Sequence, residues 1–189
     1  MDGTLASCRV AAEPGRLGGG GGAVPWAEST GRAVAVKIRL LSIGTRMPAW
    51  VRDGYETYAR RLPKDNQLLL EEIARPGQDR DVSRTRGQEG ARMLARIRPA
   101  DWVVALDERG ESWTTSELSQ RMADWRTQAR QPVLLIGGPD GLAAECLERA
   151  DNRWSLSALT LPHALVRVLV AEQIYRAWTL LNGHPYHRH

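Results

Sequence analysis

The sequence predicts an α/β fold, a mostly parallel sheet with helices on both of its faces. Short apolar segments alternate with longer segments of helical periodicity, which is the order of a chain built from βα units. The segment Val133-Leu134-Leu135-Ile136 is apolar throughout, as expected for a strand that is covered on both sides. With 189 residues, of which 42% are hydrophobic and 25% charged, the chain has the composition of a soluble globular protein.

The first half of the domain is predicted to alternate strand, helix, strand and helix. Apolar runs predict strands at 37–43 and 67–73. The helix between them, at 48–61, opens with a proline, which a first turn tolerates, and its apolar residues are spaced three or four apart. A second helix is predicted at 83–97, where Pro99 ends it.

The second half repeats this alternation. Strands are predicted at 101–106, 132–136 and 153–156, and helices at 114–129, 143–149 and 162–181. Thr114 or Thr115 is suited to cap the third helix, and Pro162 to open the last one. The last helix is apolar around most of its circumference, more than one sheet face requires, so we expect a second subunit to cover it.

Residues 1–35 differ from the rest of the chain. They hold eight of the eighteen glycines, including the run 18–22, and show neither helical nor strand periodicity. They also lack the apolar stretch of a signal peptide. We therefore expect a disordered, Gly-rich extension at 1–35, which is a mis-assigned or dispensable start, and a folded domain at 36–189.

Composition restricts the cellular setting and the partners. The net charge of +4 and the pI near 9.5 favour a polyanionic partner, although many basic proteins bind no nucleic acid. No apolar run approaches the roughly 18 residues that a membrane span needs, and Cys8 and Cys146 have neither disulfide nor metal-ligand spacing. The sequence thus predicts a cytoplasmic protein with no membrane span and no metal site. Its seven tryptophans, without a single Phe, have no functional explanation at this level.

A glycine-rich turn follows the strand at 132–136. The segment Gly137-Gly138-Pro139-Asp140-Gly141 offers backbone without side-chain bulk at the carboxyl end of a parallel strand, where ligands bind in open α/β sheets. A tight turn that requires positive φ explains these glycines equally well. Because no Lys-Ser/Thr pair follows, and the pattern is not G-x-G-x-x-G, phosphate binding is disfavoured.

A small apolar loop precedes the last helix. Between Ser155 and His163, the hydroxyl residues Ser157 and Thr160 stand among apolar ones. A loop this apolar should be buried, either by protein packing, with Thr160 as the N-cap of the helix, or by a flat ligand such as adenine.

The C-terminal tail combines titratable and aromatic side chains. Tyr186, His187 and Arg188 are together suited to orient an acceptor, to remove a proton near neutral pH and to bind phosphate. A frayed basic end is the simpler interpretation. Arg176 either joins this set or only forms an i, i+4 ion pair with Glu172.

These segments together resemble the RlmH family of ribosomal-RNA large-subunit methyltransferases, small members of the SPOUT (α/β-knot) superfamily. The resemblance covers essentially all of 36–189. It rests on several segments in the same order: Lys37-Ile38-Arg39-Leu40, 44–51, 58–64, Leu106-Asp107, 135–142, 154–163, 165–169, Tyr175-Arg176-Ala177-Trp178 and His184-Pro185-Tyr186-His187-Arg188.

The resemblance implies a C-terminal trefoil knot, a homodimer, and transfer of a methyl group from S-adenosylmethionine to N3 of a pseudouridine in 23S rRNA, on the assembled ribosome. It also implies that the cofactor lies against three loops, which contain Leu106, Gly137, Gly138, Leu156, Ser157, Ala158, Leu159, Thr160, Leu161 and Pro162.

For the chemistry implied by the resemblance, we expect His187 to remove the N3 proton and Tyr186 to position the ring. Arg188 and Arg176 would bind phosphate or stabilise negative charge. The tail of one subunit is expected to meet the pocket of the other.

Two alternative functions stay open. Another SPOUT methyltransferase, acting on tRNA or on a ribose 2′-hydroxyl, would share these motifs, although the missing extra RNA-binding domain favours rRNA. A non-catalytic ribosome-binding module would keep the fold, but the intact Gly137-Gly138 loop and the complete tail argue against it.

Overall fold

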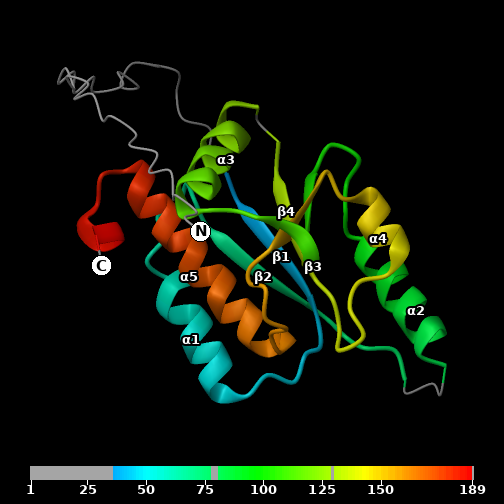
Figure 1. Ribbon diagram of the computed structural model, residues 1–189. Helices are drawn as coiled ribbons and strands as arrows, with labels where there is room; N and C mark the ends of the chain where they lie inside the picture. Colours follow the sequence, from blue (N-terminus) through cyan, green and yellow to red (C-terminus); the bar gives the residue numbers. More distant parts are fainter. Residues whose placement is uncertain (1–35, 78–80, 129, 189) are drawn as a thin grey trace, which may run out of the picture. The chain divides into compact units, whose positions relative to one another are not determined.

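Five parallel strands form one sheet in the part of the chain that the computed structural model describes, residues 36–77, 81–128 and 130–188 (Figure 1). Their order is β2-β1-β4-β3-β5, with bounds Leu68–Ile73, Ile38–Ile43, Pro132–Ile136, Trp102–Ser112 and Asn152–Ser155. The predicted α/β fold with a mostly parallel sheet is confirmed. The trefoil knot stays a prediction, and the expectations for 1–35 lie outside the described residues.

Helices cover both faces of the sheet, as the sequence predicts. One face carries α1, α3 and α5, with bounds Ala49–Ala59, Thr115–Thr127 and His163–Leu181 (Figure 1). The other face carries α2 and α4, with bounds Val82–Leu94 and Ala144–Arg149. A short 3₁₀ helix, η1 (Pro185–Arg188), follows α5 and packs against it.

The strands place alternate side chains in two separate cores. Leu40 and Leu134 belong to the core beneath α1, α3 and α5, whereas Leu41 and Leu135 belong to the core beneath α2 and α4. All four side chains are fully buried. Because both faces are covered, successive residues of a central strand must be apolar, which explains the uninterrupted apolar runs.

Of the predicted helix N-caps, the one for α3 is confirmed and one interpretation for α5 is wrong. Thr114 caps α3 through a capping box, in which Glu117 N–H donates to the Thr114 hydroxyl and the Glu117 carboxylate accepts from Thr114 N–H. The N-cap of α5 is Pro162, which offers no side-chain acceptor, so the interpretation of Thr160 as the N-cap is wrong. Proline suits this position because its fixed φ matches a helix entry.

β3 continues to Ser112, well beyond its predicted end at 106. The strand leaves β5 after Leu106 and pairs with it again from Glu111, and Trp154 is the partner at both points. We call the intervening residues 107–110 the β3 excursion. The sequence concealed this continuation because the apolar run ends at Leu106 and the rest of the strand is polar.

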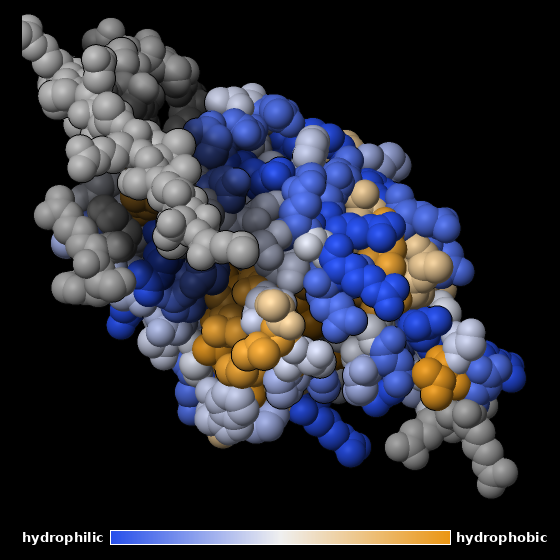
Figure 2. Space-filling model, viewed as in Figure 1, coloured by the Kyte–Doolittle hydropathy of each residue, from blue (hydrophilic) through white to orange (hydrophobic). Residues whose placement is uncertain are grey.

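The surface of α5 is not fully covered within one chain. Figure 2 shows hydrophobic side chains gathered over the N-terminal half of this helix, where Leu165, Val168 and Leu169 are only half-buried. This is the helix that the sequence predicts to be covered by a second subunit.

Candidate active site and family

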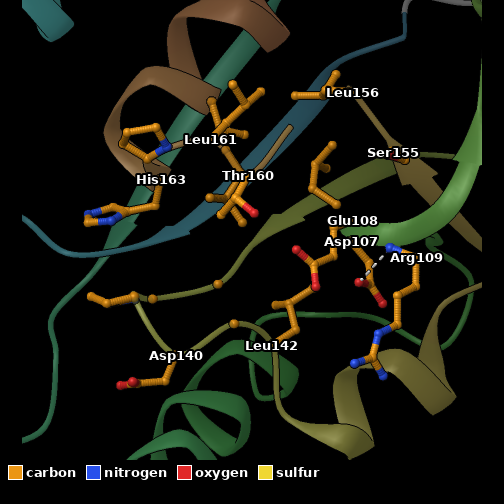
Figure 3. Close-up of a pocket in the computed structure, with 18 of the residues that line it drawn as sticks. Asp107, Glu108, Arg109, Asp140, Leu142, Ser155, Leu156, Thr160, Leu161 and His163 are labelled. Carbon is orange, nitrogen blue, oxygen red and sulfur yellow. Dashed lines mark hydrogen bonds between the residues drawn. The ribbon is translucent and has the colours of Figure 1, made fainter. Parts of the chain in front are cut away.

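A cavity of about 790 Å³ lies at the carboxyl ends of β3, β4 and β5, beside the start of α5 (Figure 3). These strands are neighbours in the sheet, so their following loops converge at one edge. Nine of the ten predicted cofactor-binding residues line it: Leu106, Gly137, Gly138, Leu156, Ser157, Leu159, Thr160, Leu161 and Pro162. The tenth, Ala158, is exposed and does not line the cavity.

The glycine loop is both a tight turn and a wall of this cavity. Gly141 N–H donates to Gly138 C=O over 3.0 Å, and Gly141 has φ +80, so the turn interpretation holds. A Cβ on Gly137 would lie 2.5 Å from the carbonyl carbon of Gly141, so any larger residue there would force the backbone to move. The chain therefore exposes bare backbone to the cavity at Gly137 and Gly138.

A buried carboxylate supports the glycine loop from outside. Glu89 of α2 is 3% exposed, and its Oε2 would lie 2.7 Å from a Cβ placed on Gly138. Arg75 joins this carboxylate (3.0 Å) to that of Asp140 (3.8 Å). The sequence showed only a polar loop around Arg75, because nothing in it links that loop to a turn more than sixty residues later.

The hydroxyl groups of Ser155 and Ser157 form hydrogen bonds with the backbone of the loop that precedes α5. Ser155 donates to Ser157 C=O over 3.1 Å, and the Ser157 hydroxyl accepts from Leu159 N–H over 2.9 Å. Leu159 is 74% exposed. The expectation that packing within the chain buries this loop is therefore wrong for Leu159. Its apolar side chain is available to a ligand or to a second copy.

The β3 excursion brings charged residues that sequence reasoning missed. Asp107, Glu108 and Arg109 line the cavity, and Figure 3 shows the two carboxylates between the 156–162 loop and Leu142. Arg109 N–H donates to the Asp107 carboxylate over 3.1 Å. One feature could have indicated Asp107, namely that it directly follows a buried strand.

His163 brings an imidazole to the cavity. It lines the cavity at the first position of α5. Burial lowers the pKa of His163, and the positive charges of Arg167 and Arg75 lower it further. The side chain is therefore neutral near pH 7 and does not repel a cationic ligand.

The predicted tail residues lie at the opposite end of α5. Arg176 binds the Glu172 carboxylate (Nε 2.8 Å, Nη2 2.6 Å), so the ion-pair interpretation is confirmed. Tyr186 donates to the same carboxylate over 3.3 Å, and Arg176 lies over the Tyr186 ring at 5.0 Å. Arg176 and Tyr186 thus form one cluster. The side chains of His187 and Arg188 lie outside the described part of the structure.

Tyr186 is a hydrogen-bond donor and not a base. Burial, together with the negative charge of Glu172, raises the pKa of Tyr186 to about 12. Its ring packs edge-on against Tyr175, with centroids 4.9 Å apart. The phenol therefore stays protonated at neutral pH and is held in one orientation.

Within one chain, the tail cluster does not reach the cavity. Val166 lines the cavity, and Arg176 lies ten residues further along the same helix, about 15 Å away at about 1.5 Å per residue. Tyr186 is likewise not among the lining residues. The structure thus brings nine of the predicted cofactor residues together but leaves Arg176 and Tyr186, two of the predicted catalytic residues, elsewhere.

Comparison with known proteins defines the class. A family model described as "Predicted SPOUT methyltransferase" matches residues 36–187, which include both the cavity and the tail. A solved probable methylase family protein from Haemophilus influenzae Rd KW20 superposes with a TM-score of 0.49 at 13% identity, covering 79% of this chain and 69% of its own.

Curated relatives give the particular family. Proteins named "Ribosomal RNA large subunit methyltransferase H" are 50% identical over 155 residues in Pseudomonas aeruginosa (strain LESB58) and 52% identical over 156 residues in Methylococcus capsulatus (strain Bath). Each match covers 81% of this chain and 100% of the relative. The chain therefore belongs to the RlmH family of SPOUT methyltransferases, and the resemblance found in its sequence is confirmed.

Two further features bear on the setting of the site. None of the helices in the described residues is long and apolar enough to cross a membrane. Within those residues, no three His, Cys, Asp or Glu side chains gather as metal ligands would. That the enzyme uses no metal stays a prediction.

Proposed function

We propose that this chain transfers a methyl group from S-adenosylmethionine to N3 of a pseudouridine in 23S rRNA, acting on the assembled ribosome in the cytoplasm. One observation carries the proposal. The SPOUT methyltransferase family model matches 36–187, which include the three-loop cavity and the tail cluster, and curated relatives are about half identical over 155 residues.

The cavity suits the proposed methyl donor in size and chemistry. Its volume of about 790 Å³ lies within the roughly 300–1,000 Å³ of small-molecule sites. Leu106, Leu156 and Leu161 offer apolar contact to a base, whereas bare backbone at Gly137 and Gly138 allows close hydrogen bonding. When bound, S-adenosylmethionine supplies an electrophilic methyl group on a positively charged sulfur.

Charge at the cavity is consistent with a cationic donor. Among the charged residues that line the cavity, the carboxylates of Asp107, Glu108 and Asp140 outnumber the guanidiniums of Arg86 and Arg109, and the depressed pKa of His163 keeps that imidazole neutral. These groups would orient the donor rather than react with it. The remaining requirements are proximity, alignment and a deprotonated acceptor.

The tail cluster would supply the acceptor side. The N3–H of a pseudouridine is a weakly acidic imide, so a nearby base must accept its proton. We assign that role to His187, with the protonated Tyr186 orienting the ring and Arg188 and Arg176 binding phosphate or developing negative charge.

Two copies would complete one site. Arg176 lies about 15 Å beyond Val166 along α5, and neither Arg176 nor Tyr186 lines the cavity, so the two parts of the proposed site are separate within one chain. We propose a homodimer in which the tail of one copy reaches the cavity of the other. The half-buried apolar surface of α5 supports this arrangement, since such a surface favours a partner (Figure 2).

Purified protein, labelled S-adenosylmethionine and ribosomes from cells that lack the enzyme test the proposal. We expect one methyl group on a 23S rRNA pseudouridine, located by mass spectrometry of rRNA fragments. Methylation of tRNA or of a ribose hydroxyl would support another SPOUT activity. Cofactor binding without transfer to any RNA would support the non-catalytic module.

The role of His187 has its own test. His187→Ala should abolish turnover while calorimetry shows unchanged cofactor affinity. Full turnover by this variant would exclude His187 as the base.

A further inference from the structure

We propose that Trp113 is a positioning residue for the cofactor cavity: stacked on Trp154, it holds the β3 excursion in place as one wall. The inference rests on the proposed function, since it assumes that the donor binds in this cavity. Trp113 itself is not among the residues that line the cavity, so it would act through Trp154 and the excursion.

The excursion needs support from outside itself. Residues 107–109 line the cavity, yet the strand pairs with β5 only before and after them, at Leu106 and from Glu111. The hydrogen bond from Arg109 N–H to the Asp107 carboxylate lies within the excursion and does not tie it to the sheet. Its position therefore depends on what holds the second pairing segment.

Two contacts add to the strand pairing that holds this segment against β5. A Cβ on Gly110 would lie 2.7 Å from the backbone of Arg153 and Trp154, so the end of the excursion rests directly on the main chain. Next along the chain, the Trp113 ring stacks on Trp154 with centroids 5.1 Å apart and planes at 11°. Trp154 is 2% exposed and lines the cavity. The stack thus connects the outer surface to the cavity wall.

A third layer covers Trp113. The Arg121 guanidinium lies 4.0 Å from the Trp113 ring centre, and both side chains contact the Glu111 carboxylate, at 3.4 Å from Arg121 Nη2 and 3.2 Å from Trp113 Nε1. The capping box of Thr114 then begins α3 immediately after Trp113. The order from the surface inward is Arg121, Trp113, Trp154 and the cavity.

The same strand contains a matched control. Trp102, at the opposite end of β3, is also half-buried, has Arg130 over its ring at 4.4 Å and donates through Nε1 to Asn152 over 2.9 Å. It does not line the cavity and stacks on no residue that does. A purely structural tryptophan–arginine pair should behave as Trp102 does.

The experiment compares Trp113→Ala and Trp113→Phe with Trp102→Ala in the full chain. Calorimetry measures the Kd for S-adenosylhomocysteine, the product form of the donor, and denaturation measures stability. We expect about a tenfold weaker Kd for Trp113→Ala, recovery to within about threefold for Trp113→Phe, and no more than about a twofold change for Trp102→Ala. Turnover at a saturating donor concentration should change little in all three variants. The weaker binding in Trp113→Ala should therefore appear as a higher KM for the donor.

Arg121→Met, paired with Arg130→Met, repeats the comparison without opening the core, should Trp113→Ala fail to fold. We expect about a threefold weaker Kd for Arg121→Met only. If Trp113→Ala and Trp102→Ala weakened the Kd equally, or if Arg121→Met and Arg130→Met did, the inference would be overturned and the proposed function would stay intact. If the unaltered protein bound no S-adenosylhomocysteine, the proposed function would fail, and this inference with it.

Discussion

The two ends of α5 hold their arginines in different ways. Arg167, near the cavity, is fully buried and donates to the carbonyls of Ile43 (2.9 Å) and Gly44 (2.7 Å) and to the Glu72 carboxylate (2.7 Å). Arg176, near the tail, is partly exposed, and its partner Glu172 lies on its own helix. The first arginine ties α5 to the ends of two strands, whereas the second pairs within its own helix and lies over the Tyr186 ring.

This difference indicates that the two ends of α5 have different roles. The cavity end is built from backbone and from buried contacts between distant segments. The tail end is built from partly buried side chains of α5 and of η1, the short helix that follows it. Substitutions should therefore affect stability and cofactor affinity at one end and turnover at the other.

The largest expected effect is on stability, at the cavity end. Arg167→Met removes the partner of Glu72 and leaves two carbonyls without their donor, so we expect a loss of about 3 kcal/mol in the free energy of unfolding. Arg176→Met should lose no more than about 1 kcal/mol, because its pair is partly exposed. Urea denaturation measures both. Similar losses would show that the two ends do not differ in this way.

A cofactor-specific effect is expected at the glycine loop. Gly137→Ala places a methyl group 2.5 Å from the Gly141 backbone, which must move, so we expect the Kd for S-adenosylhomocysteine to rise about a hundredfold. The control is Gly87→Ala in α2, where a Cβ meets nothing within 4 Å and helix propensity improves by up to about 1 kcal/mol. Unchanged affinity in Gly137→Ala would remove this loop from the cofactor site.

At the tail end, a substitution should lower turnover and leave the affinity for the cofactor unchanged. Arg176→Ala removes a guanidinium that lies over Tyr186, so we expect kcat on ribosomes to fall about tenfold with an unchanged Kd for S-adenosylhomocysteine. Arg60→Ala is the matched control, since Arg60 forms the same i, i+4 pair with Glu56 on the exposed surface of α1. A weaker Kd in Arg176→Ala would show that the two ends are not independent.

The smallest effect concerns pH. The folded protein holds the pKa of His163 below the value of about 6.5 expected when unfolded, chiefly through burial and then through Arg167 and Arg75, with Glu89 opposing. The unfolded chain therefore binds this proton more readily, and stability present above about pH 6.5 is lost as the pH falls through the folded pKa.

His163→Gln should make this acid-side decline shallower in urea denaturation between pH 7 and 5. An identical decline in His163→Gln and the unaltered protein would show that His163 does not contribute to it.

Much of the fold follows from short-range patterns. The strands and helices begin and end within a few residues of their predicted positions, because apolar periodicity, Pro99 and the Thr114 cap act over one or two turns. The main miss is the second part of β3, whose polar residues give no strand pattern and are held by Gly110 and Trp113 against β5.

The candidate site was predicted unevenly. Nine of the ten residues predicted to bind the cofactor line one cavity, because neighbouring parallel strands bring their following loops to one edge. Asp107 and Glu108 were missed because charged residues after a strand resemble any solvated turn. The support of Gly138 by Glu89 and Arg75 depends on segments far apart in sequence, which no local pattern connects.

By itself, the sequence determined the alternating elements, the two covered sheet faces, the glycine turn and the family, since these are written in patterns of neighbouring residues. Only the tertiary structure decided that the tail cluster lies about 15 Å from the cavity, that β3 departs from the sheet to line it, and that two tryptophans back that wall. Such relations depend on strand order and helix length, which set distances between residues that the chain itself keeps far apart.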